Sequence, residues 1–197
     1  NITEEQENHV HVFIEQALFN GVYGIVHPLY KHKFATVSKE YKTRLKLLNS
    51  VPWVQLLELL EVDKRFYDAE ADETPFSKAI GILQEMTEQR SPTSKLMVFG
   101  RMLKAMNKEI GTHVGSSVVL DWDTMFTTFL FVLLRAKLPD LHVESAFLCD
   151  FMYQQSKKEQ HGAWVSLMEA ALMHILIYDW LQHFKVEYTL IVKKKTT

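Results

Sequence analysis

Apolar residues recur at helical spacing along nearly the whole chain, and this pattern narrows the folds that the sequence can adopt. The strongest case follows Asp121-Trp122-Asp123, where the stretch from Met125 to Leu134 is apolar almost all round. A helix of this kind is buried from several sides, and the stretch is too short to span a bilayer. With 7 Gly and 5 Pro in 197 residues, the chain also lacks the turn residues that an all-β fold needs. We therefore expect an all-α fold with the helix after Asp123 at its centre.

Capping residues, prolines and glycines mark where the other helices should begin and end. A first helix is expected from the capping box at residues 3–6 until Pro28 ends or kinks it, and a second helix from near Ser38. Proline at the first helical position and glycine after the last turn are typical helix boundaries. Such signals lie at Thr74-Pro75, Ser91-Pro92 and Pro139-Asp140, with Gly111 as an expected stop. The polar segments 63–73 and 154–161 are predicted to be loops.

Charge and residue chemistry exclude several classes of function. The 22 basic and 24 acidic residues give a net charge of -2, without the basic excess that is typical of a nucleic-acid binder. The single Cys149 can form neither an internal disulfide nor a cysteine-based zinc site, which suits a reducing, cytosolic compartment. The 9 His include no His-x-x-x-His or Glu-x-x-His pair, and no glycine-rich phosphate loop is present. We expect no metal, no cofactor, no nucleic-acid partner and no transmembrane segment.

Three separated segments are similar to the motifs of one family. They are Ser91-Pro92-Thr93-Ser94-Lys95-Leu96, then Trp122-Asp123-Thr124-Met125-Phe126-Thr127 leading to Leu138-Pro139-Asp140-Leu141, and last Gly162-Ala163-Trp164-Val165-Ser166-Leu167. In order and spacing they resemble the Ser-Pro-x-x-Lys-Leu, Ala-Asp-Asp-hydrophobic-Leu-Pro and Gly-Tyr-Tyr-x-Thr-Asn-Leu motifs of the Vps-nine domain, the exchange-factor domain for Rab GTPases of the Rab-five group. The resemblance implies one Vps-nine-like domain over residues 1–197. It would be a layered helical bundle, in which a helical N-terminal subdomain of lead-in helices (1–60) packs on an exchange core (61–185) and a tail (186–197) follows.

The resemblance places an acidic residue at the start of the central helix. Asp123 falls on the family's aspartate, and Trp122 replaces a small residue before it. The resemblance implies that Asp123 is the catalytic carboxylate. The partner contacts implied on the same helix are Thr124, Phe126 and Thr127, the last in place of a proline. An Asp at a helix start is also among the commonest capping residues; if Asp121 is the cap, Asp123 is free for the other role.

The start of the last helix departs from the family pattern. Ala163 stands where the family usually has a tyrosine, and Trp164 follows one residue later. Ser166 matches the family threonine, whereas Leu167 replaces an asparagine. The resemblance implies that Ala163, Trp164, Ser166 and Leu167 meet the GTPase. A Trp near a helix start is also common as a half-buried packing residue, and both interpretations are open for Trp164.

The resemblance implies guanine-nucleotide exchange on an endosomal Rab GTPase, with no covalent chemistry. The domain would loosen a nucleotide that the GTPase holds through magnesium and a lysine, and would bind the nucleotide-free GTPase best. The missing tyrosine predicts weak activity. One alternative is a non-catalytic module that binds a Rab or another partner, and a more distant one is a helical scaffold with an accidental likeness. We expect a cytoplasmic protein that is recruited peripherally to early endosomes.

Overall fold

The apolar periodicity of the sequence produces helices throughout the described part of the chain. The computed structural model describes residues 4–115, 121–152, 160–178 and 180. Within these residues the chain forms eight α-helices, two short 3₁₀-helices and no strand, which confirms the all-α class. The α-helices are α1 (Glu4–Lys33), α2 (Ala35–Asn49), α3 (Trp53–Leu59), α4 (Ser77–Gln84), α5 (Pro92–Val114), α6 (Trp122–Ala136), α7 (Leu141–Phe151) and α9 (Gln160–Ile177). The 3₁₀-helices are η1 (Lys64–Phe66) and η2 (Glu85–Glu88).

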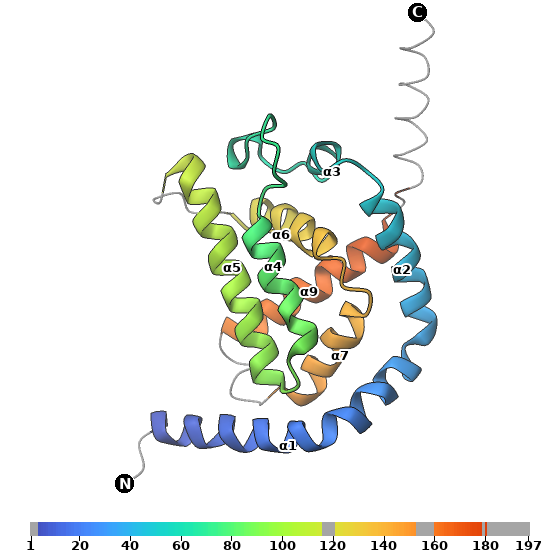
Figure 1. The fold of residues 1–197 in the computed structure, drawn as a ribbon, viewed down its shortest axis with the longest axis vertical. Coiled ribbons are helices and arrows are strands. Elements are labelled where there is room, and N and C mark those ends of the chain that lie inside the picture. Colours follow the sequence, from blue (N-terminus) through green and yellow to red (C-terminus); the bar gives the residue numbers. More distant parts are fainter. Residues whose placement is uncertain (1–3, 116–120, 153–159, 179, 181–197) are drawn as a thin grey trace, which may run out of the picture.

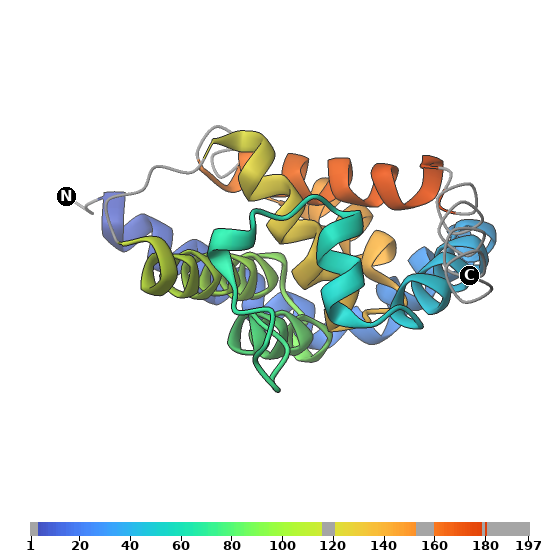
Figure 2. The same ribbon diagram turned by 90° about the horizontal axis from the view of Figure 1, so that it is seen from above.

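Helix α6 is the buried centre of the fold. Its first turn is exposed, but residues 129–134 are at most 1% exposed. Helices α2, α3, α4 and α9 all pack around it. Figure 2 shows the layers: α9 lies on one side of the molecule and the α4–α5 pair on the other, with α6 and α7 between them. A helix that is apolar all round requires this many neighbours.

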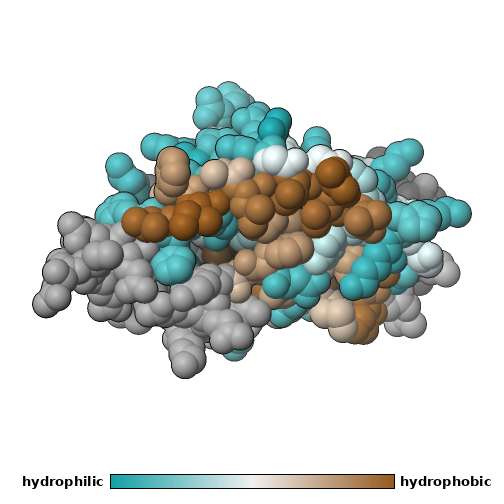
Figure 3. Space-filling view, turned by 90° about the horizontal axis from the view of Figure 1, so that it is seen from below, coloured by the Kyte–Doolittle hydropathy of each residue, from teal (hydrophilic) through white to brown (hydrophobic). Residues whose placement is uncertain are grey.

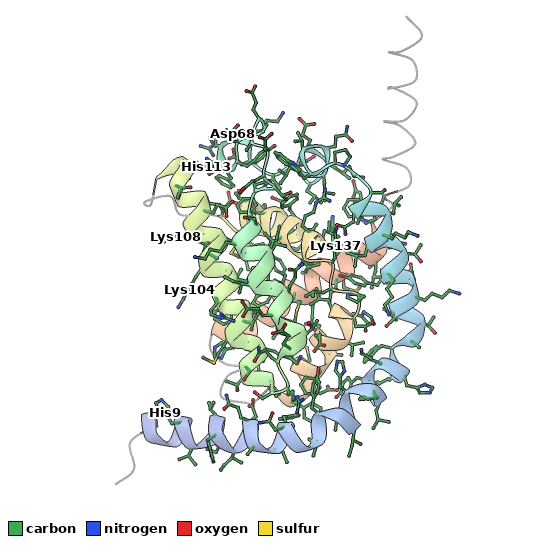
Figure 4. All side chains as sticks on the ribbon, in the orientation of Figure 1. His9, Asp68, Lys104, Lys108, His113 and Lys137 are labelled. Atoms are coloured by element: carbon green, nitrogen blue, oxygen red, sulfur yellow. The ribbon has the colours of Figure 1, made fainter. Side chains whose placement is uncertain are left out.

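Helix α5 illustrates how a motif in the sequence sets a helix boundary. Ser91 is the N-cap: its hydroxyl accepts a hydrogen bond from the backbone N–H of Ser94 at 3.2 Å. Pro92 occupies the first helical position, where its missing N–H is not needed. Along the helix the inner face is buried, whereas Lys104 and Lys108 project from the outer face away from the fold (Figure 4). The motif therefore fixes the start of a helix that has one buried and one solvated face.

Helices α1 and α2 form an arc around the core (Figure 1). Helix α1 packs on α5 and α7, and α2 packs on α6 and α9. On α1, Phe19 is buried with its ring nearly perpendicular to the rings of Phe147 and Phe151 on α7, at centroid distances of 5.3 and 5.2 Å. Helix α2 therefore contributes to the main hydrophobic core, whereas α1 is attached to the fold through the packing of Phe19 on α7.

A buried group of charged and polar side chains ties α1 to this core. The ammonium of Lys95, which is fully buried, lies 2.7 Å from Glu144 and donates hydrogen bonds to the carbonyl of Met86 at 3.0 Å and the hydroxyl of Tyr23 at 3.2 Å. His27 Nε2 donates to the other oxygen of Glu144 at 3.0 Å. Burial lowers the pKa of Lys95, although the charge of Glu144 opposes this. For Glu144, burial alone would raise the pKa, but the hydrogen bond from His27 and the charge of Lys95 hold it below its usual value.

Several helix boundaries differ from those expected. Pro28 lies inside α1, which continues to Lys33, and α2 begins before Ser38. Pro28 is exposed and does not end α1, but the helix curves around the core toward its C-terminal end (Figure 1), in agreement with the alternative that the helix bends. Helix α4 begins after Phe76, which adopts a left-handed conformation, rather than at Pro75. Helix α5 passes through Gly111 and ends at Gly115, whose φ of 91° favours glycine. The loop expected at 154–161 and the tail at 186–197 lie largely or wholly outside the described residues.

Candidate functional site

Two aspartates lie at the start of α6, and only one of them caps the helix. Asp121 is the N-cap: its carboxylate accepts a hydrogen bond from the backbone N–H of Thr124 at 2.7 Å. Hydrogen bonding to Thr124 holds the pKa of Asp121 below its usual value. The capping role that the sequence left open between Asp121 and Asp123 thus belongs to Asp121.

Asp123 is exposed at the second position of α6. Within the described residues its carboxylate makes no hydrogen bond or ion pair. Asp123 therefore presents a negative charge to solvent that no neighbour in the described structure neutralises.

The next residues of α6 connect its exposed start to α9. Phe126 is half-buried and its ring meets His174 of α9 nearly at right angles, 5.8 Å between centroids. Thr124 and Thr127 are also half-buried, and the Thr127 hydroxyl donates to the carbonyl of Thr124 at 3.3 Å. In Figure 2 the N-terminal end of α6 and the length of α9 lie along the same side of the molecule. One surface thus includes the exposed start of α6 and the outer face of α9.

The four residues expected at the start of α9 form two pairs, one exposed and one packed inward. Ala163 and Ser166 are exposed on its outer face. Leu167, by contrast, is 1% exposed and belongs to the hydrophobic core. An apolar side chain at the position of the family's asparagine turns inward, because there it can be removed from water. Leu167 is therefore a core residue in this structure and not part of the exposed surface.

Trp164 also packs inward. Its ring lies 6.2 Å from the ring of Phe99 on α5 and 5.0 Å from that of His161. It covers Gly100 so closely that a Cβ at this position would lie 2.6 Å from the nearest Trp164 ring atom. Of the two interpretations that the sequence left open for Trp164, the packing role is the one that its contacts support.

One residue on this surface was not singled out as a contact from the sequence. Trp122, the first residue of α6, is 51% exposed and stands directly before Asp123. Exposed tryptophans are frequent anchors of protein interfaces. The signal in the sequence was the replacement of a small family residue by the largest side chain beside the acidic position.

Residues outside this surface hold α9 in place. Arg44 of α2 donates hydrogen bonds to the carbonyls of Tyr178 and Ile175 at 2.8 and 3.4 Å, which satisfies carbonyls at the C-terminal end of α9. The Cys149 thiol of α7 donates to the carboxylate of Glu169 at 3.0 Å. Contacts with α2 and with α7 therefore hold α9 in its position beside α6. No group of side chains in the described segments has the composition of a metal site.

Residues 76–179 match the model of the Vacuolar sorting protein 9 (VPS9) domain. This chain belongs to the VPS9 domain family. The match begins just before α4, extends past the end of α9 and so contains every residue of the surface described above.

Curated relatives extend the similarity toward the N-terminus. The chain is 23% identical over 178 residues to "Alsin homolog" of Drosophila melanogaster, an alignment that covers 88% of this chain and 12% of the relative. It is 23% identical over 141 residues to "Alsin" of Mus musculus and of Homo sapiens, covering 65% of this chain and 8% of each relative. The chain thus spans about a tenth of the length of these relatives.

Membership of the VPS9 family makes this chain a domain of the type that promotes nucleotide exchange on Rab GTPases. None of the helices in the described ranges has the length and apolarity to cross a membrane.

Proposed function

We propose that this domain promotes release of guanine nucleotide from a GTPase of the Rab-five group, with Asp123 as the catalytic residue. The single observation that carries the proposal is the contrast at the start of α6. Asp121 caps the helix, and Asp123, two residues on, is exposed and makes no interaction within the described residues. A carboxylate that the fold does not need is available for a partner.

The chemistry of exchange needs such a carboxylate. A small GTPase holds its nucleotide through magnesium and through a lysine on the β- and γ-phosphates. A carboxylate inserted at that site pairs with the lysine and repels the phosphates, so the nucleotide-bound complex is weakened and the nucleotide-free complex is favoured. The exchange rate then rises because the domain binds one state of the GTPase more tightly than the other. No covalent bond is made or broken.

The surface beside Asp123 supplies the contacts to the GTPase in this proposal. Trp122 and Asp123 form its part on α6, with the half-buried Thr124, Phe126 and Thr127 beneath them, and Ala163 and Ser166 form its part on α9. Trp164 and Leu167 act from below by holding α9 against α5 and the core. Neither side chain contacts the GTPase directly in this proposal.

The proposed activity is weak. At position 163 the family usually has a tyrosine, and here a methyl group is exposed. Trp164 cannot substitute for it, because its ring is turned onto Gly100. Loss of one aromatic anchor costs about 1–3 kcal/mol of interface energy, so exchange slower by about one to two orders of magnitude than in a typical member is expected. The same observation favours the second candidate, a module that binds the GTPase without accelerating release.

The test is the release rate of fluorescent GDP from a Rab-five-group GTPase. We expect a slow but concentration-dependent acceleration by the wild-type domain. Asp123→Ala should reduce it by about 10²–10³-fold, as is typical when a group that stabilises charge is removed. Asp121→Ala is the matched control, since it removes a neighbouring carboxylate that is committed to the helix.

Each remaining outcome selects another function. Binding to the nucleotide-free GTPase without acceleration of release identifies the non-catalytic module. Equal acceleration by wild type and Asp123→Ala, at equal melting temperature, removes Asp123 from the mechanism. A preference for a GTPase of another Rab group contradicts the proposed specificity. The location that fits the proposal is the cytoplasmic face of early endosomes, which fluorescence microscopy of the tagged domain would test.

A further inference from the structure

The outer face of α1 carries a continuous apolar surface. Six large apolar side chains on it are each more than half exposed. They are Val10, Phe13, Ile14, Leu18, Ile25 and Leu29, and we call them the α1 stripe. In Figure 3, which views the molecule from below, a band of hydrophobic surface crosses the face that α1 covers in Figure 1. Helix α1 already buries Phe19 on its inner face, so it is apolar on two opposite sides. A helix of this kind is normally covered on both.

The middle of the stripe is hollow. Ala17, Gly21 and Gly24 are exposed there, and a Cβ added at Gly21 or Gly24 would meet no atom within 4 Å. Leu18 and Ile25 stand beside this row of small residues. Small residues at this spacing let the backbone of a second helix approach closely. A flat lipid surface gains nothing from such a hollow, so its shape favours a helix as the occupant.

The stripe is complementary to itself in the antiparallel direction. When two copies of α1 are paired about a two-fold axis between residues 19 and 20, Leu18 of one copy lies opposite Gly21 of the other. The same register places Ile14 opposite Ile25 and Val10 opposite Leu29. Large side chains thus meet the hollow at the centre and each other at both ends. A two-fold axis requires self-complementarity of this kind.

The charges at the C-terminal end of α1 favour the same direction. Its last turn contains Lys31, His32 and Lys33. Antiparallel pairing places the basic ends of the two helices at opposite ends of the pair, whereas parallel pairing brings these like charges together. The helix dipoles are also opposed in the antiparallel pair.

We propose that α1 is a dimerisation helix, and that the partner of the α1 stripe is the same stripe on a second copy of this chain in antiparallel register. In Figure 1, α1 runs along the lower edge of the molecule, whereas α6 lies in its central part.

The first experiment is light scattering or sedimentation equilibrium of the purified chain over a concentration series. The mass should approach twice the 23.0 kDa of the chain. Leu18→Glu should raise the dissociation constant at least about ten-fold, and Gly21→Leu should do the same by filling the hollow. Gly21→Leu makes the stripe more apolar, so non-specific association or lipid binding would increase in this variant. Met97→Glu, which changes an exposed apolar residue of α5, should leave the mass unchanged. Melting temperatures of all variants establish that they are folded.

The second experiment tests the register in a Cys149→Ser background. Ile14 and Ile25 lie about 16 Å apart along the helix axis, so neither Ile14→Cys nor Ile25→Cys alone should form an intermolecular disulfide. Mixed together, the two variants should crosslink, because positions 14 and 25 face each other across the two-fold axis and a disulfide needs Cα atoms within about 7 Å. A monomer at all concentrations, an undiminished Gly21→Leu dimer, or crosslinking of the single variants would each overturn the proposal. A monomer that instead co-floats with anionic vesicles would assign the stripe to a membrane.

Discussion

The starts of α5 and α6 are built alike but surround their charged residues in opposite ways. Each helix begins with a side chain that caps it, Ser91 in α5 and Asp121 in α6, and each carries a charged family residue in its first turns. In α5 that residue is Lys95, which is fully buried and has all its partners inside the fold. In α6 it is Asp123, which is exposed and has no partner in the described residues. Two motifs that resemble those of the same family therefore place one charge in the core and the other in solvent.

The two charges differ in whether water can hydrate them. Lys95 cannot be hydrated, so its charge is tolerated only while Glu144 and the acceptors around it are present. Asp123 is exposed and hydrated, so its charge does not depend on partners inside the fold. Burial and hydrogen-bond partners, rather than the match to a motif, distinguish the two roles.

The largest effect should follow from breaking the buried pair. Glu144→Gln leaves the Lys95 charge uncompensated and should lower the free energy of unfolding by about 3–5 kcal/mol. Urea denaturation measures this. In Lys95→Met combined with Glu144→Leu, both charges are replaced by apolar groups, and much of the loss should be recovered. If Glu144→Gln unfolds at the wild-type urea concentration, the pair does not stabilise the packing of α5 on α7.

The next largest effects distinguish Trp164 from Trp122, because one substitution should reduce stability and the other should reduce binding. Trp164→Ala removes a half-buried ring from between α5 and α9 and should cost about 2–3 kcal/mol of stability, somewhat less than for a fully buried Trp. Trp122→Ala should leave stability unchanged and weaken binding to the nucleotide-free GTPase by about 1–2 kcal/mol, or about five- to thirty-fold.

Gly100→Ala is a control for the packing role of Trp164, because the added methyl group must displace the ring. It should destabilise the domain without touching the exposed surface. Calorimetry and a binding titration on the same four proteins distinguish the roles. A Trp164→Ala variant with full stability and weakened binding would reverse the assignment of the two tryptophans.

The sequence predicts the helices of this fold better than their limits. Apolar periodicity identifies the central helix, because the buried stretch 129–134 needs no tertiary information to be recognised. Gly111 is misleading as a stop, and Pro28 bends its helix without ending it, because a glycine within a packed helix and a proline on an exposed face are both tolerated when neighbouring contacts hold the helix. These contacts join residues far apart in the sequence, so local signals do not contain them.

The candidate site also combines features that the sequence shows with features that only the structure shows. Asp123 can be located from its motif, but only the hydrogen bond from Thr124 to Asp121 shows which carboxylate is committed to capping. The inward turn of Trp164 depends on Gly100, sixty-odd residues earlier and in another helix, and no spacing rule links the two. Leu167 was expected at the surface because the family has a polar residue there, whereas its own apolar character already favoured the core.

A smaller effect is expected from restoring the family residue on α9. Position 163 is exposed on the outer face, so Ala163→Tyr places an aromatic ring there without disturbing the core. Exchange should become about ten-fold faster, equivalent to about 1.4 kcal/mol. Release of fluorescent GDP measures this, and Lys108→Tyr, at an exposed position on the outer face of α5, is a matched control that should have no effect. If both variants behave like wild type, position 163 does not face the GTPase.

The smallest effect concerns the cap itself and completes the contrast between the two aspartates. Asp121→Ala removes the acceptor of the Thr124 N–H and should lower stability slightly, with exchange retained, whereas Asp123→Ala should retain stability and lose exchange.

Because the hydrogen bond lowers the pKa of Asp121, the stability that Asp121 contributes is present above the usual carboxyl pKa and is lost as the pH falls through the lower pKa of the folded state. Asp121→Asn keeps a capping side chain without a titrating group, so its stability should fall less than that of wild type between neutral and strongly acidic pH. Urea denaturation at a series of pH values tests this. Identical pH profiles for wild type and Asp121→Asn would mean that Asp121 is not the residue that caps α6 in solution, and Asp123 would then be the candidate for the cap.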